Sequence, residues 1–149
     1  MRHALVIAAI FTLSIVTVPS AIRASAFAQA TANNQSAPAA PAVKRTVLLQ
    51  HDTSAPGFEA LLVSVEIPVG GREGRHTHPG LAMIHVLEGT LSLDYEGKPQ
   101  ANYKAGESFF VEAGKVHEGI NKGNAPVKAI ATFIIPKGQA VTTQVAAAK

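Results

Sequence analysis

The sequence predicts an all-β domain, a sandwich or a small barrel, between residues 43 and 136. Short apolar runs recur there, and residues 90–95 alternate apolar and polar side chains with the period of two that a half-buried strand shows. Glycine, proline and asparagine separate these runs at short intervals. The region lacks the apolar stripe of 3.6-residue period that a helix would need.

Six strands are expected in this region. They are residues 46–51, 59–68, 82–88, 90–95, 108–111 and 127–135. Glu88-Gly89 is expected to join two of these strands as a two-residue hairpin connection, and residues 96–99 form a turn. Four aromatic residues are expected in the core or lining a barrel: Tyr95, Phe109, Phe110 and Phe133.

The two ends of the chain differ from this region. Residues 1–28 have the three parts of a secretory signal peptide: a short positive start, an apolar run and a small-residue cleavage site. Residues 29–42 contain no charged or aromatic side chain and are expected to be a flexible linker. Residues 137–149 are expected to be a mobile C-terminal tail. We therefore expect a periplasmic or secreted protein, associated with a membrane only if the leader stays uncleaved.

The composition excludes several classes of function. The absence of cysteine excludes disulfides, thiolate metal sites and cysteine nucleophiles. The chain has 13 basic and 10 acidic residues. Two of the basic residues, Arg2 and Arg23, fall in the expected signal peptide, so the charge does not favour a nucleic-acid partner.

Three histidines have positions that suggest a metal site. His76 and His78 are two residues apart, so in an extended chain their imidazoles project from the same face. His117 follows a predicted strand and a turn and can complete a three-nitrogen site. The expected cofactor is a divalent transition metal: Zn, Fe, Mn, Ni or Cu. His51 and His85 are isolated and are expected to be structural or exposed.

The sequence around these histidines resembles the two motifs of the cupin superfamily. The residues that fit the first motif are Gly70, His76, His78 and Gly89, and those that fit the second are Gly106, Gly114, His117 and Asn121. The resemblance implies a small jelly-roll barrel, also called a double-stranded β-helix, with the site inside it between the two motifs.

The chain departs from these motifs at two positions. Ala82 stands where the first motif has a glutamate that is usually a metal ligand, and Glu112 replaces the proline of the second motif. Without that carboxylate, three neutral imidazoles leave the charge of a divalent ion unreduced, which favours an anionic or chelating ligand. Glu112 is one alternative for the missing ligand. His85 is another, if a bulge in its strand turns it inward.

These features favour an exported single-domain cupin that binds a metal through His76, His78 and His117 and acts on a small oxygen-bearing or anionic ligand. If it is an enzyme, the resemblance favours dioxygenase-like or isomerase-like chemistry, and no catalytic residue is identified. The alternatives are a non-enzymatic small-molecule-binding cupin with a degenerate metal site, and a scaffold of the cell envelope. Arg72 and Arg75 are solvated loop charges or attract an anionic ligand. We expect a homodimer, because pairing at strand edges adds buried surface to a small barrel.

Overall fold

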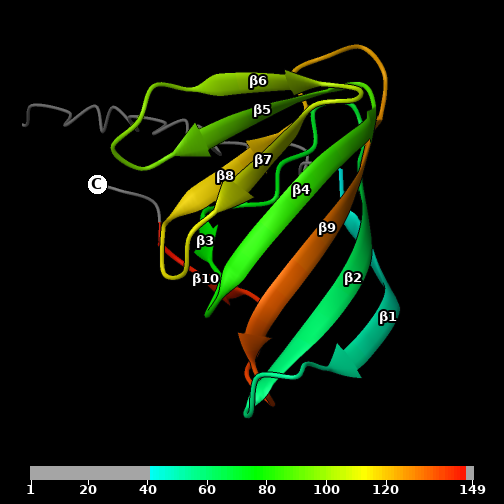
Figure 1. Ribbon diagram of the computed structural model, residues 1–149. Helices are drawn as coiled ribbons and strands as arrows, with labels where there is room; N and C mark the ends of the chain where they lie inside the picture. Colours follow the sequence, from blue (N-terminus) through cyan, green and yellow to red (C-terminus); the bar gives the residue numbers. More distant parts are fainter. Residues whose placement is uncertain (1–40, 147–149) are drawn as a thin grey trace, which may run out of the picture. The chain divides into compact units, whose positions relative to one another are not determined.

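The computed structural model describes residues 41–146, which form two five-stranded antiparallel sheets (Figure 1). The first sheet has the strand order β1-β2-β9-β4-β7 and the second β10-β3-β8-β5-β6. The strands are β1 (Lys44–Asp52), β2 (Phe58–Ile67), β3 (His76–Thr77), β4 (Leu81–Glu88), β5 (Thr90–Tyr95), β6 (Ala101–Lys104), β7 (Ser108–Val111), β8 (His117–Ile120), β9 (Val127–Pro136) and β10 (Thr143–Gln144). No helix within residues 41–146 is long and apolar enough to cross a membrane.

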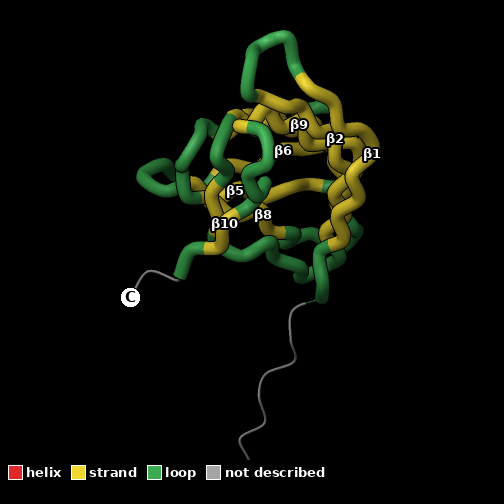
Figure 2. The backbone as a smooth tube through the Cα atoms, turned by 90° about the horizontal axis from the view of Figure 1, so that it is seen from below, coloured by secondary structure: helices red, strands yellow, loops and turns green. Residues whose placement is uncertain are grey.

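The core lies between the two sheets. Along β2 and β9, buried residues alternate with more exposed ones, as expected for strands with one face turned inward. The buried side chains of β2 (Leu61, Val63, Val65 and Ile67) belong to the same apolar cluster as Leu91 and Leu93 of β5 in the other sheet. Figure 2 shows β1, β2 and β9 on one side and β5, β8 and β10 on the other.

The all-β prediction is confirmed, and each of the six expected strands is found with ends shifted by at most a few residues. The four strands that the sequence analysis missed are all short: β3, β6, β8 and β10. Two of these, β3 and β8, carry histidines of the predicted metal site. Strands of two to four residues are too short to show a periodic pattern in the sequence, and β7, which also has four residues, was predicted from its apolar run instead.

The Glu88-Gly89 hairpin prediction is wrong. β4 pairs with β7 and β9, whereas β5 pairs with β6 and β8, so the chain crosses from one sheet to the other at Gly89. Gly89 has a φ of 79°, and a Cβ there would lie 2.6 Å from the carbonyl oxygen of Pro126. Glycine is therefore required for a tight crossing rather than for a hairpin.

The structure describes only part of the predicted terminal segments of the chain. The predicted signal peptide (residues 1–28) and nearly all of the predicted linker (29–42) lie outside the described residues. Within the predicted tail (137–149), the structure places β10, which pairs with β3. The backbone N–H of Val145 also donates a hydrogen bond to the carbonyl oxygen of Arg75 at 2.8 Å. This segment therefore contributes to the sheet that holds the histidines.

Candidate metal centre

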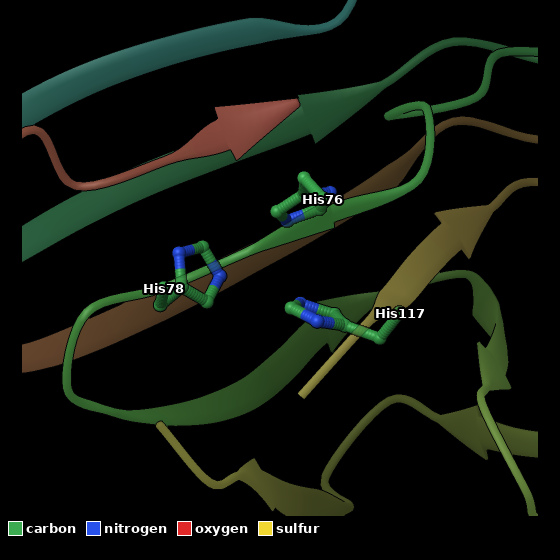
Figure 3. A group of neighbouring side chains, drawn as sticks. All are labelled: His76, His78 and His117. Atoms are coloured by element: carbon green, nitrogen blue, oxygen red, sulfur yellow. The ribbon is translucent and has the colours of Figure 1, made fainter. Parts of the chain in front are cut away.

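Short strands of the second sheet bring the three predicted histidines together. His76 begins β3, His78 follows β3, and His117 begins β8, where it lies directly opposite His76 in the antiparallel register. All three side chains are buried, with exposed fractions of 2%, 5% and 4%. Their ring centroids are 4.3 to 4.9 Å apart, and the imidazoles point towards one another (Figure 3).

Backbone carbonyl groups fix the orientation of each imidazole. Because a carbonyl oxygen only accepts hydrogen bonds, the Nδ1 atom of each ring must be the donor. His76 donates to Gly74 at 2.7 Å, His78 to Val141 at 2.7 Å and His117 to Lys115 at 3.0 Å. Each ring therefore carries a proton on Nδ1, which leaves Nε2 as the atom that can bind a metal, as in known metal-binding histidines.

The donor set fits a transition-metal ion. One potential ligand atom from each histidine lies within 4.8 Å of the other two. Burial, partly opposed by the hydrogen bonds to Val141 and Lys115, lowers the pKa of His78 and of His117 from 6.5 to about 4. Both rings are thus neutral at pH 7, which is the form that coordinates a metal. The three histidines can therefore hold a metal ion.

The histidines line an interior cavity of about 160 Å³. A protein cavity of about this size admits a benzene ring. The lining is mostly apolar, and it includes Phe133, whose ring lies 4.8 Å from that of His78. Two charged residues, Arg45 and Glu73, also line the cavity. The cavity therefore offers three imidazole ligands, one arginine, one glutamate and an apolar wall.

Neither of the two alternatives for the missing carboxylate lies in this cavity. Glu112 is exposed and accepts a hydrogen bond from the hydroxyl of Tyr95. His85 is exposed on the opposite face of β4 from Ala82, where its Nδ1 hydrogen-bonds the hydroxyl of Ser108. Ala82 itself is fully buried. Residue 82 thus faces the interior, as the motif requires, without a side chain that can bind metal.

Three of the four aromatic residues expected in the core or lining a barrel are found there. Tyr95 and Phe133 are buried and Phe109 lines the cavity, but Phe110 is 57% exposed, because it lies on the outer face of β7. His51 is exposed. The core prediction is therefore wrong for Phe110 and correct for the other three aromatic residues.

The two arginines beside the histidine motif do not line the cavity. Arg72 donates two hydrogen bonds to the carboxylate of Glu118, and Arg75 pairs with Glu96 at 2.9 Å. The charged residues that do reach the cavity, Arg45 and Glu73, were missed by the sequence analysis. Glu73 lies three residues before His76, but one acidic residue between the two arginines of a glycine-rich loop has no pattern that separates it from a solvated charge.

Comparisons with known proteins agree with this fold. The family model described as "Cupin domain" matches residues 63–135, and the chain belongs to the cupin superfamily. No curated protein matches the sequence.

Solved structures share the fold at low sequence identity. A cupin superfamily protein from Desulfitobacterium hafniense is 16% identical with a TM-score of 0.54, over 64% of this chain and 80% of that one. An uncharacterized protein with a double-stranded β-helix domain from Klebsiella pneumoniae is 20% identical with a TM-score of 0.56, over 70% of this chain and 90% of that one. The polyketide cyclase RemF from Streptomyces resistomycificus is 19% identical with a TM-score of 0.58, over 74% of this chain and 75% of that one. At these identities the likeness establishes the fold alone.

Proposed function

We propose that this protein is an exported metal-binding cupin that holds a divalent transition metal through His76, His78 and His117. The observation that carries the proposal is the convergence of three buried imidazoles, each with Nδ1 hydrogen-bonded to a carbonyl oxygen. Three protein ligands leave coordination positions open for a small oxygen-bearing or anionic ligand. The metal, Zn, Fe, Mn, Ni or Cu, would polarise ligand oxygens as a Lewis acid, and a redox-active metal would add oxygen chemistry.

Metal content tests this proposal. The protein is purified without a histidine tag or chelator, and its transition metals are measured by mass spectrometry. We expect close to one metal ion per chain, and none in the His76→Ala/His117→Ala variant. The His85→Ala variant is the matched control, because His85 is exposed on the outer face of the first sheet and should not change the metal content. Equal metal in the wild type and the double variant would contradict the proposal.

A second candidate function is non-enzymatic binding of a small molecule, with a degenerate metal site. Ala82 favours it, because the first motif lacks its carboxylate, and so does the mostly apolar lining of the cavity. The discriminating measurement is the wild-type metal content after incubation with each of the five metals. Less than about a tenth of an equivalent for all of them would favour this second function. If the protein binds the metal and is an enzyme, its resemblance to cupins favours dioxygenase-like or isomerase-like activity.

We also propose export to the periplasm or the medium and assembly as a homodimer. The signal-peptide pattern of residues 1–28 supports export. Strand β1 supports pairing, because it is an edge strand on which Val47, Leu48 and Leu49 are more than half exposed. Sequencing of the mature N-terminus tests the first proposal. Light scattering tests the second, and a mass no larger than that of one 15.5-kDa chain at micromolar concentration would contradict it.

A further inference from the structure

Glu73 extends into the cavity because residue 119 is a glycine. Glu73 lies in the loop between β2 and β3, and its backbone N–H donates to the carbonyl oxygen of Gly119 at 3.0 Å. A Cβ built on Gly119 would collide with Oε2 of the Glu73 carboxylate. The carboxylate therefore occupies the space that an ordinary side chain at position 119 would fill.

This position is next to the histidines. Gly119 follows His117 by two residues on β8, so both face the same side of the strand. Both of these residues line the cavity, as does Glu73. Among the described residues, the group that could hold a metal ion consists of the three histidines without Glu73, so the Glu73 carboxylate faces the same cavity without belonging to the ligand set.

Arg45 holds the carboxylate in place. Its Nη2 donates to Oε1 of Glu73 at 2.7 Å, and this ion pair links β1 of the first sheet to the loop before β3 of the second. The Glu73 side chain is 14% exposed and that of Arg45 39%. Within residues 41–146, only Oε1 of this carboxylate has a hydrogen-bond partner. Oε2 is therefore available as an acceptor on the cavity wall.

We propose that Glu73, positioned by Arg45, accepts a hydrogen bond from the ligand bound at the three histidines, and that this ligand is a small chelating molecule with an N–H or O–H donor. This inference rests on the proposed metal site. The cavity has room for about one six-membered ring, so we expect the apolar part of the ligand to be a single ring that packs against the apolar wall. A ligand whose only polar group is a carboxylate is disfavoured, because its oxygens would face the Glu73 carboxylate.

Two probes that share a phenyl ring test this proposal on the full chain loaded with Co²⁺. Benzohydroxamate chelates through two oxygens and keeps an N–H donor, whereas benzoate has no donor. Their affinities are measured from changes in the visible absorption of Co²⁺. For Glu73→Met, we expect about ten-fold weaker binding of benzohydroxamate and equal or tighter binding of benzoate, because an acceptor is lost and Arg45 is released. Glu73→Gln keeps a neutral acceptor and is expected to lose less affinity.

The controls separate this proposal from its alternatives. Glu88→Met removes an exposed glutamate that pairs with Lys128, and it should leave both affinities unchanged. Arg45→Met should weaken benzohydroxamate binding, and Arg45→Lys should restore part of it. Equal affinities of wild type, Glu73→Met and Glu73→Gln for both probes would overturn the role of Glu73 while leaving the metal site intact. A wild type that takes up no Co²⁺ would overturn the metal site and this inference together.

Discussion

His78 donates a hydrogen bond from its ring Nδ1 to the carbonyl oxygen of Val141, at 2.7 Å and across 63 positions of the sequence. The other two histidines use carbonyl groups two residues before them, at Gly74 and Lys115. Val141 precedes β10, which pairs with β3. The segment after β9 therefore orients one potential metal ligand, in addition to contributing a wall of the cavity.

Truncation after Gly138 is predicted to weaken metal binding. It removes the carbonyl acceptor of His78 and strand β10, so the imidazole loses its fixed orientation. Loss of such a partner typically lowers metal affinity about 10- to 100-fold. The measurement is competition for Zn²⁺ with a chromophoric chelator, with circular dichroism to verify the β-structure. Truncation after Ala146 is the control, because it keeps Val141 and β10; equal Zn²⁺ affinity of both truncated chains would contradict the prediction.

The metal-free protein is predicted to lose stability as the pH falls from about 6.5 to about 4. Burial lowers the pKa of His78 and His117 to about 4 in the folded chain, from 6.5 for an unperturbed histidine. Within this window the unfolded chain binds protons that the folded chain does not, so the free energy of unfolding decreases as the pH decreases. Each pH unit in the window removes at most about 1.4 kcal/mol per histidine.

Urea unfolding at several pH values, with a chelator present, tests this dependence. His117→Gln removes one of the two histidines whose pKa burial lowers, so its free energy of unfolding should fall less steeply between pH 6.5 and 4. The His85→Gln variant, at an exposed position, should keep the wild-type slope. A slope that is the same in wild type and His117→Gln would show that burial of the His117 ring does not control this pH response.

The sequence predicted the parts of the site that depend on local spacing. His76 and His78 share a face because they are two residues apart, and motif spacing placed His117 with them. The contacts that complete the site depend on long-range pairing. Val141 lies beside His78 because β10, which follows it, pairs with β3, and the two residues of β10 show no strand pattern in the sequence. Glu73 and Arg45 meet because the first strand of one sheet lies beside a loop of the other, which no periodicity encodes.

Asn121 is predicted to stabilise the fold rather than to contact the ligand. Its side chain is 1% exposed, its amide donates to the carbonyl oxygens of Ile67 and Ala125, and its Oδ1 accepts from the backbone N–H of Gly123. Asn121→Ala leaves these buried groups without partners, at a cost of roughly 3 kcal/mol in the free energy of unfolding. Chemical denaturation measures it, with exposed Asn124→Ala as the control. A loss as small as that of the control would contradict this role.

Ala82→Glu is predicted to destabilise the metal-free protein and to strengthen metal binding. Ala82 is fully buried opposite Phe133, whose ring contacts that of His78, so a longer side chain at position 82 can reach the histidines. Without metal, an unpaired buried carboxylate costs about 2 kcal/mol or more. With Zn²⁺, the carboxylate adds a fourth ligand.

Unfolding temperatures with chelator and with Zn²⁺ are compared for Ala82→Glu and for Ala82→Gln, which has the same size without the charge. We expect Zn²⁺ to raise the unfolding temperature of the glutamate variant more; an equal rise in the two variants would mean that the carboxylate does not reach the metal.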